Sequence, residues 1–491
     1  MPEESAATSD DASVDQKRLD KLRLGHIIAG PAVFALMLLA PIESMSYEIR
    51  CSFGLLLWMS WWWIARPVHL AVTGFLPLAL VAIFDFVAIS QILSAYATEL
   101  IILLLSANIL TTTWTRWGLD RRIALASLIG IGTNTTRQIL AWFAIGMVLS
   151  AFLPNTIVAA TMIPIVVAML RFIGVEDLWN SNLGTALVIA VAWGTSAGGA
   201  TTPLGGAPNL LAIEFIQETV TGQEFAFTTW VTRFLPLSLA VMFVTFIYVR
   251  FAFKPEMKEI PGARDYFVGE FRSLGAMSAQ EKWALVLFSI ATILAFTRPL
   301  YADLAPSFRP AFAFLVCAIV CCLVRTNGES LMTWEYAQKR MMWGLFYLFA
   351  GGTALGRILS ETGTAAYIAE RLIPYAAGGG IVAVVVFAAL TILMTQITSN
   401  TAAVAVTVPI TISTFDSLGV NPLPFVYIVA AVGNCGYMLP TSAGGPAVAA
   451  GYGINLKTML IKGFWASLLS LGAVILVGYL LAIYWPAFGT A

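Results

Sequence analysis

Charged side chains are scarce in this sequence of 491 residues. Asp, Glu, Lys and Arg make up only 11% of the chain, whereas 59% of the residues are hydrophobic. About one residue in four is charged in a soluble domain, so the composition excludes an ordinary soluble protein. The mean hydropathy of +0.84 indicates an integral membrane protein. The 27 basic and 27 acidic residues leave no net charge, which gives no reason to expect a nucleic-acid partner.

Cysteine is also rare, and its positions argue against a metal site or a disulfide framework. The five cysteines lie in apolar surroundings, without C-x-x-C spacing and without a histidine nearby: Cys51, Cys317, Cys321, Cys322 and Cys435. Structural metal sites and disulfide-rich folds depend on such spacings. We therefore expect no bound cofactor.

The shortage of histidine weakens the one catalytic motif in the chain. The stretch "GTSAG" at 194–198 matches the G-x-S-x-G nucleophile elbow of hydrolases, with Ser196 as the candidate nucleophile. A nucleophilic serine needs a base, yet His26 and His69 are the only histidines, and neither has an acidic partner close by in the sequence. An intramembrane serine hydrolase therefore remains only as the alternative from another class, and we expect no enzyme.

Long apolar runs dominate the rest of the chain. With about 20 residues needed for each helical crossing, the sequence predicts an all-α polytopic membrane protein with about eleven transmembrane helices. Two runs, 139–173 and 380–415, are too long for one crossing and too short for two, and both have polar residues at their centre. They are predicted to be re-entrant hairpins that enter and leave on the same side of the membrane. Two others, 183–216 and 423–451, are interrupted by Gly and Pro, which is typical of broken helices.

The segments group into two halves. We expect a cytoplasmic tail over 1–23, a first half over 24–252 with scaffold helices and an arm helix near 117–135, a cytoplasmic connector over 253–282, and a second half over 283–491. Basic residues gather in alternate loops, which predicts a cytoplasmic N-terminus and an outside C-terminus in an inner or plasma membrane surrounded by lipid. Few acidic residues fall inside the spans, which argues against a proton relay.

An internal repeat relates the two hairpins. The stretch "SAFLPNTIVAATMIPI" at 150–165 aligns with "TQITSNTAAVAVTVPI" at 395–410, so Asn155 corresponds to Asn400 at an offset of 245 residues. An odd number of crossings in each unit would insert the two copies in opposite directions, as in the inverted repeats of secondary transporters. Helix breaks near the middle of the membrane free backbone carbonyl groups for a cation and backbone N–H groups for an anion.

These motifs resemble the divalent anion:sodium symporters, a family that moves dicarboxylates, tricarboxylates or sulfate. Its tips carry Ser-Asn-Thr, which Ser399, Asn400 and Thr401 match in full, whereas the first copy reads Pro154, Asn155 and Thr156. The resemblance implies a homodimer whose transport part moves like an elevator against a scaffold. It also implies that sodium is the coupling ion.

The resemblance further implies two sodium sites and a substrate site. The first sodium site would use Ser150, the main chain of Pro154, Asn155 and Gly205, and the second would use Thr395, Thr398, Asn400 and Ser442. The substrate would contact Asn155, Thr156, Gly206, Ser399, Asn400, Thr401 and Ala443.

The chain departs from the family pattern at the helix breaks. "GAPN" at 206–209 and "AGGPA" at 443–447 stand where the family has hydroxyl-bearing Pro-Pro-Asn motifs, and Pro154 replaces a serine. The hypothesis is therefore a sodium-coupled transporter of a small anion: a di- or tricarboxylate, sulfate or a related sulfonate. A sodium-independent anion exchanger is the alternative within the same class.

Overall fold

The computed structural model describes residues 4–326, 328–376 and 380–490, and nearly all of its regular structure is helical. The first half of the chain contains α1 (Glu4–Leu39), α2 (Tyr47–Ala65), α3 (Leu70–Thr73), α4 (Leu76–Phe84), α5 (Ile89–Ser94), α6 (Glu99–Trp117), α7 (Leu119–Leu128), α8 (Thr135–Ser150), α9 (Asn155–Phe172), α10 (Asn182–Gly199), η1 (Pro203–Gly205), α11 (Ala207–Phe215), η2 (Ile216–Thr221) and α12 (Phe227–Ala252).

The second half continues with α13 (Ala263–Ser273), α14 (Ala279–Phe296), α15 (Arg298–Tyr301), α16 (Pro310–Leu323), α17 (Trp334–Arg340), α18 (Trp343–Glu361), α19 (Thr364–Ala376), α20 (Gly380–Ile397), α21 (Asn400–Ser417), α22 (Leu423–Gly433), α23 (Gly444–Gly451), α24 (Leu456–Tyr484) and η3 (Pro486–Gly489). Two short antiparallel strands, β1 (Arg325–Thr326) and β2 (Glu329–Ser330), pair Arg325 with Ser330.

In all four interrupted segments, the helix break predicted from the sequence is present in the structure. The first predicted hairpin forms α8 and α9, separated by residues 151–154, and the second forms α20 and α21, separated by two residues. The two predicted broken helices form α10 with α11 and α22 with α23. Three of the breaks contain Gly or Pro, and Pro lacks an N–H donor while Gly stabilises a helix poorly. The break between α20 and α21 contains neither, and there Ser399 caps the start of α21 by accepting from Ala402 N.

The interrupted helices form the centre of the molecule. From Leu183 to Gly199 every residue of α10 is buried, and the whole of α22 is buried as well. Small side chains allow this close packing: Gly194 lies against the backbone of Phe143, and Gly198 lies against that of Met147, both in α8. The polar breaks of these helices therefore lie inside the protein and away from its outer surface.

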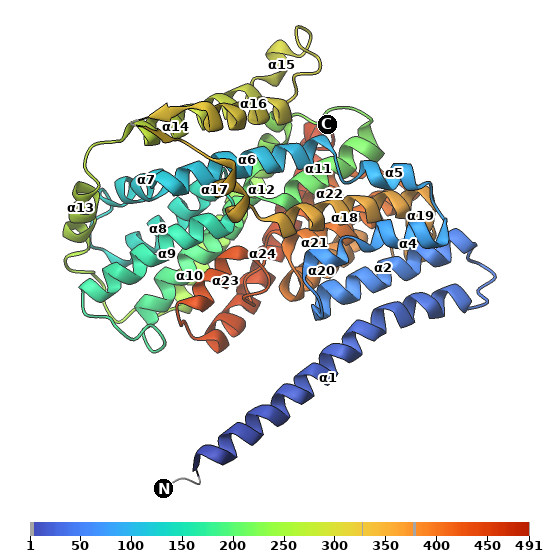
Figure 1. Cartoon of the computed structure of the whole chain (residues 1–491), viewed down its shortest axis with the longest axis horizontal. Helices are drawn as coiled ribbons and strands as arrows, with labels where there is room; N and C mark the ends of the chain where they lie inside the picture. Colours follow the sequence, from blue (N-terminus) through green and yellow to red (C-terminus); the bar gives the residue numbers. More distant parts are fainter. Residues whose placement is uncertain (1–3, 327, 377–379, 491) are drawn as a thin grey trace.

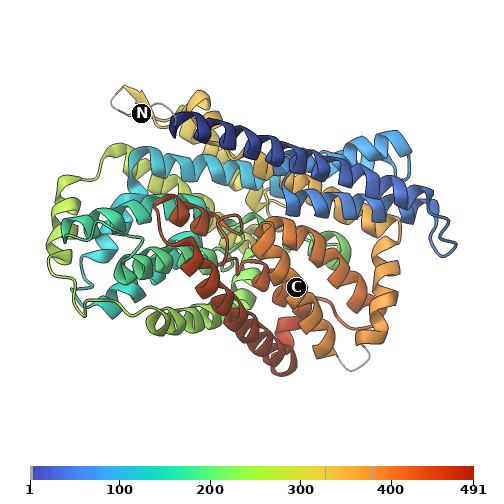
Figure 2. The same cartoon turned by 90° about the horizontal axis from the view of Figure 1, so that it is seen from below.

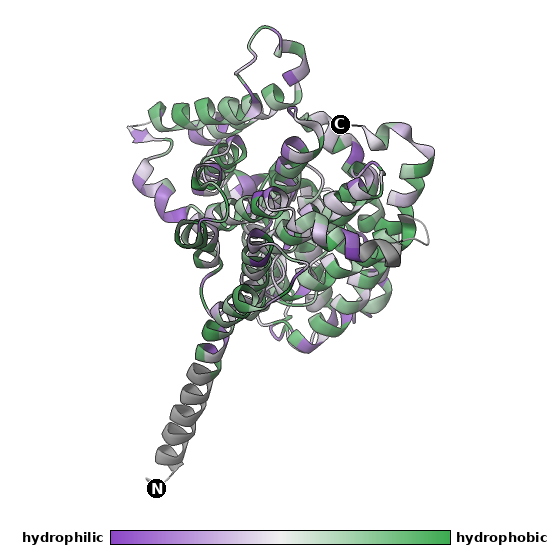
Figure 3. Cartoon of the chain, turned by 90° about the vertical axis from the view of Figure 1, so that its right-hand side faces the viewer, coloured by the Kyte–Doolittle hydropathy of each residue, from purple (hydrophilic) through white to green (hydrophobic). Residues whose placement is uncertain are grey.

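Helices at the periphery expose large apolar side chains instead. Examples are Phe243 in α12, Ile293 in α14, Leu323 in α16 and Leu476 in α24. Figure 3 shows hydrophobic colour along the helices of the body and hydrophilic colour mainly at helix ends and in connecting segments. Such an apolar outer surface suits contact with lipid.

By length and composition, six of the described helical segments could each cross a membrane: Leu22–Leu39, Ile89–Trp117, Asn155–Phe172, Phe227–Ala252, Ala279–Phe296 and Leu456–Tyr484. The pair α17 and α18, bent by 64°, would make a seventh if counted as one span, and four shorter apolar helices accompany them. The polytopic helical architecture agrees with the sequence analysis. The expected number of about eleven crossings stays a prediction.

Each half of the chain contains one helix that packs within the other half. In Figures 1 and 2 the segment α7–α10 lies at one end of the molecule and α18–α21 at the other. However, α23 of the second half packs on α9 and α10, while α11 of the first half packs on α21 and α18. This exchange brings the two helix breaks and the two hairpin tips together in the middle.

Segments outside the repeats also differ from the expectation in detail. The expected polar tail over 1–23 is part of helix α1 from Glu4 onward, and α1 extends away from the body in Figure 1. The expected arm helix is α7, and the expected connector contains the helix α13. The assignment of these parts to domains stays a prediction.

Candidate functional site

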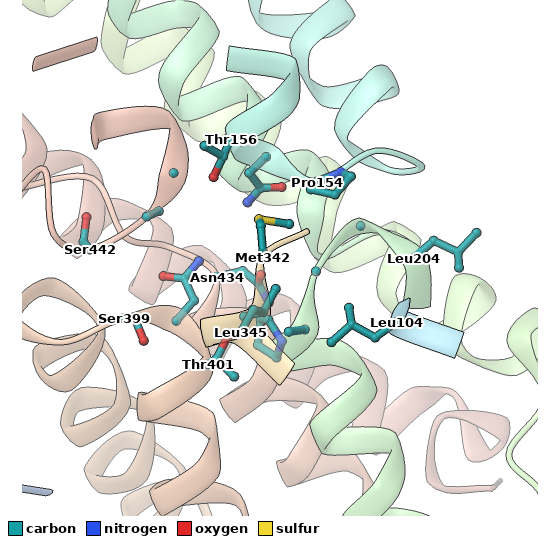
Figure 4. Close-up of a pocket in the computed structure, with 18 residues that line it drawn as sticks. Leu104, Pro154, Thr156, Leu204, Met342, Leu345, Ser399, Thr401, Asn434 and Ser442 are labelled. Carbon is teal, nitrogen blue, oxygen red and sulfur yellow. The ribbon is translucent and has the colours of Figure 1, made fainter. Parts of the chain in front are cut away.

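The repeated motifs of both halves line the same cavity. It has a volume of about 200 Å³. Its lining residues are Leu104, Pro154, Asn155, Thr156, Leu204, Gly205, Gly206, Ala207, Pro208, Met342, Leu345, Ser399, Asn400, Thr401, Asn434, Ser442, Ala443 and Gly444. Figure 4 shows Pro154 and Thr156 on one side of this space and Ser399 and Thr401 on the other.

Four helices begin at the wall of the cavity. The first residues of α9, α11, α21 and α23 are Asn155, Ala207, Asn400 and Gly444, and all four line it. The first N–H groups of a helix lack internal partners, and the helix dipole places a partial positive charge there. None of the described lining residues is charged, so these helix ends are the groups of the wall that can attract an anion.

Behind the first tip, the side-chain amide of Asn155 lies among oxygen atoms. One terminal atom of this amide is 3.2 Å from Thr195 O, 3.2 Å from Gly205 O and 2.5 Å from Ser150 Oγ. If the amide nitrogen points inward, it can donate to these atoms. If the amide oxygen points inward, the Ser150 hydroxyl donates to it, and the remaining oxygens form a cluster of the kind that hard cations occupy.

The second tip repeats this arrangement around Asn400. One terminal atom of the Asn400 amide lies 3.0 Å from Ser442 O and 3.2 Å from Gly433 O. The Thr395 hydroxyl also donates to Gly433 O, at 2.8 Å. Both asparagines therefore face main-chain oxygens at the carboxyl end of a broken helix, where the helix dipole favours a positive charge. The two oxygen clusters are the candidate cation sites.

A buried glutamine holds the second break in shape. Gln396 Oε1 accepts hydrogen bonds from the N–H groups of Tyr437 and Met438, each at 3.0 Å, and its Nε2 donates to Cys435 O at 2.8 Å. Three backbone groups of the segment between α22 and α23 are therefore satisfied by one side chain, as a buried loop requires.

An arginine from outside the repeats reaches the second tip. Arg66 follows α2, and its guanidinium donates to Thr398 O and, at 2.8 Å, to Thr441 O. The repeated motifs at 150–165 and 395–410 contain no cationic side chain themselves. The structure places this one directly behind them.

All seven expected substrate contacts line the cavity: Asn155, Thr156, Gly206, Ser399, Asn400, Thr401 and Ala443. Of the eight expected sodium ligands, five also line the cavity and three do not: Pro154, Asn155, Gly205, Asn400 and Ser442 line it, and Ser150, Thr395 and Thr398 are outside its lining. Ser150 and Gly205 surround the Asn155 amide, and Ser442 lies beside the Asn400 amide. The main-chain oxygen of Pro154, in contrast, already accepts hydrogen bonds from Ile157 and Val158 in the first turn of α9. The binding roles of these residues stay predictions.

Several lining residues were absent from the sequence-based list. Leu104, Met342 and Leu345 come from α6 and from the start of α18, and nothing in their local sequence distinguishes them from other apolar residues. Asn434 is a polar residue directly after an apolar span, which is a signal that could have been used. Its Nδ2 donates to Asn209 Oδ1 at 3.1 Å and to Ala430 O at 3.0 Å.

Ser196 occupies a structural position. It is fully buried within α10, and its hydroxyl donates to Ala192 O at 3.2 Å. His69 lies at the start of α3, where its Nδ1 accepts from Ala71 N. The glycines around Ser196 allow α10 to pack closely on α8, which accounts for the G-x-S-x-G pattern.

One buried acid was missed. Glu214 in α11 is 5% exposed, and Arg357 of α18 lies 3.9 Å from it while also pairing with Glu218. The guanidinium of Arg357 therefore compensates two carboxylates, so the buried acid is part of an ion-pair cluster near the opposite end of α11 from the lining residues Ala207 and Pro208.

Comparison with known proteins adds independent information. The family described as "Sodium:sulfate symporter transmembrane region" matches residues 22–490. The chain is 31% identical over 477 residues to the sodium-dependent dicarboxylate transporter SdcS of Staphylococcus saprophyticus, covering 94% of this chain and 91% of the relative. It is 30% identical to SdcS of Staphylococcus aureus (strain bovine RF122) over 472 residues, covering 92% and 90%.

Two solved structures share the fold at low sequence identity. The YdaH transporter of Alcanivorax borkumensis has a TM-score of 0.55 and 15% identity, covering 89% of this chain and 99% of that one. MtrF of Neisseria gonorrhoeae has a TM-score of 0.55 and 14% identity, covering 79% and 82%. The chain therefore belongs to the divalent anion:sodium symporter family, matched as sodium:sulfate symporters, and is a membrane transporter and not an enzyme.

Proposed function

We propose that this protein moves a small dicarboxylate across the membrane together with sodium ions. The observation that carries the proposal is the convergence of both Asn-Thr tips and four helix N-termini on one cavity, with an oxygen cluster behind each tip. Family membership supports sodium-coupled anion transport, and the relatives named above are sodium-dependent dicarboxylate transporters.

The size and chemistry of the cavity favour a compact substrate. Its volume of about 200 Å³ is below the roughly 300–1,000 Å³ of most ligand pockets. A four-carbon dicarboxylate such as succinate suits this space better than a tricarboxylate. The Thr156 and Thr401 hydroxyls and the helix N-termini can donate to its carboxylates, while sodium ions compensate the negative charge.

In the proposed cycle, sodium binds first and draws the amide oxygens of Asn155 and Asn400 inward. The ordered tips then present their N–H groups to the anion. The hairpins and broken helices move as one transport part against the remaining helices, in an elevator motion, within a homodimer. The cytoplasmic N-terminus, the outside C-terminus and the re-entrant course of the hairpins belong to the same proposal.

Uptake into proteoliposomes tests this function. Labelled succinate should accumulate when sodium is present outside and should not when choline replaces it, and unlabelled dicarboxylates should compete better than citrate or sulfate. Asn155→Ala and Asn400→Ala should each raise the sodium concentration for half-maximal uptake at least about tenfold, because each removes an oxygen ligand.

Asn421→Ala is the matched control, since Asn421 is exposed and bonds to Gly489 O away from the cavity. It should transport normally. Counterflow of labelled substrate without sodium would instead favour the exchanger. Normal uptake in both tip variants would remove the site assignment.

A further inference from the structure

Arg66 has an unusual backbone position that aims it at the second hairpin tip. It is the residue after α2 and adopts the left-handed conformation, with φ 51°. Among the described residues other than glycine, only Arg66 and Asp85 have positive φ. This conformation costs free energy for a residue with a Cβ and is found at functional sites.

The guanidinium binds two carbonyl oxygens next to the second oxygen cluster, and one of them belongs to an expected sodium ligand. Thr398 O directly follows α20 and has no backbone N–H donor among the described residues, and Thr441 O, 2.8 Å from the guanidinium, directly precedes Ser442. Thr398 and Ser442 are both expected sodium ligands. A guanidinium keeps its charge in proteins and accepts no hydrogen bond, so it satisfies these oxygens as a cation does.

The first copy of the repeat provides an internal comparison. At the offset of 245 residues, Leu153 corresponds to Thr398. Within the described part of the chain, the donor to Leu153 O is the neutral Ser150 hydroxyl in its own turn, at 3.4 Å. The two oxygen clusters are therefore alike in their asparagine and unlike in their surroundings. Among the side chains that the structure describes, an arginine donates to carbonyl groups next to the second cluster and none does so next to the first.

We propose that Arg66 is a built-in competitor for sodium at the second site. Sodium must displace the guanidinium from Thr398 O before it can bind there, so the second site is weaker than the first. The same displacement frees the end of α2 from the second hairpin. Ion binding is thereby linked to the release of a contact between elements far apart in the sequence.

This inference rests on the proposed function, and its test separates the two. Sodium dependence of succinate uptake by the unaltered full-length protein is measured first, and its absence would refute the proposed function. Arg66→Gln then removes the charge while keeping a long side chain with donors. It should lower the sodium concentration for half-maximal uptake by at least about threefold. Arg66→Lys keeps a competing charge and should stay close to the unaltered protein.

Arg50→Gln is the matched control on the same helix. Arg50 donates to Leu38 O and Ala40 O at the opposite end of α2, so its loss should leave the sodium dependence unchanged. If Arg66→Gln does not transport, sodium titration of its thermal stability in detergent replaces uptake, and half-maximal stabilisation should again come at lower sodium. An unchanged or higher sodium requirement in Arg66→Gln would overturn the inference.

Discussion

At the scale of single residues, a hydrogen bond between two asparagines connects the two broken helices. Asn209 Nδ2 donates to Gly199 O at 2.6 Å and to Thr202 O at 2.7 Å, which leaves its Oδ1 as the acceptor for Asn434. Both side chains are buried. Each caps the carboxyl end of a helix, and their mutual bond connects residues 225 positions apart. The amide orientations follow from these partners.

Replacing Asn434 by leucine tests this connection. The change leaves Asn209 Oδ1 and Ala430 O without their donor, and an unsatisfied buried polar group costs about 1–3 kcal/mol. We expect the free energy of unfolding to fall by that amount, measured as a lower unfolding midpoint in detergent. Asn180→Leu, at an exposed position, should change it by less than about 0.5 kcal/mol. Equal losses in both variants would contradict the role given to Asn434.

At the scale of elements, the site depends on the close approach of α23 to α9. A Cβ on Gly444 would lie 2.9 Å from Thr156 Cα and would also collide with the Thr156 hydroxyl. Only glycine therefore allows the N-termini of these two helices to meet at the cavity. Helix α23 belongs to the second half of the chain and α9 to the first, so this contact joins the two halves.

The substitution Gly444→Ala should separate the two helices. Overpacking costs roughly 1–3 kcal/mol, and 1.4 kcal/mol corresponds to a tenfold change. We expect the initial rate of sodium-dependent succinate uptake to fall about tenfold or more, normalised to the inserted protein. Gly451 is at the other end of α23, where an added Cβ would meet no neighbouring atom within 4 Å. The variant Gly451→Ala should therefore transport normally. Full activity of Gly444→Ala would show that the helices can separate without loss.

At the scale of the whole molecule, buried ion pairs fasten peripheral segments to the body. Arg122 in α7 pairs with Glu281 in α14 at 2.6 Å, with side-chain exposures of 12% and 6%. Arg122 also donates to the carbonyl groups of Leu274, Gly275 and Ala276. The end of the connector is therefore held against α7.

Adjacent arginines offer a direct comparison of buried and exposed pairs. Arg122→Ala leaves the largely buried Glu281 carboxylate without its cation and with the Ser278 N–H as its remaining donor, and we expect a loss of about 2–3 kcal/mol in the free energy of unfolding. Arg121 pairs with Glu270 at side-chain exposures of 48% and 31%, so Arg121→Ala should cost less than about 1 kcal/mol. Denaturant unfolding of both variants measures the difference. A similar loss of unfolding free energy in the two variants would contradict the view that burial makes the Arg122–Glu281 pair the stronger one.

The sequence by itself determined the membrane class, the helical architecture, the four helix breaks and the repeated Asn-Thr tips. Apolar runs and the residues that interrupt them, Gly and Pro at three breaks and the capping Ser399 at the fourth, act locally, so their effects can be predicted without knowing what packs on them. The pairing of Asn155 with Asn400 followed from the repeat. Their convergence on one cavity agrees with the expectation that the helix breaks of an inverted repeat lie near the middle of the membrane.

The tertiary structure alone decided which other groups surround those tips. Arg66 and Thr398 are separated by 332 residues, and Asn209 and Asn434 by 225. No local pattern encodes such contacts. The first arises because α2 packs against α21, and the second because α11 packs on α21 and α22 of the other half.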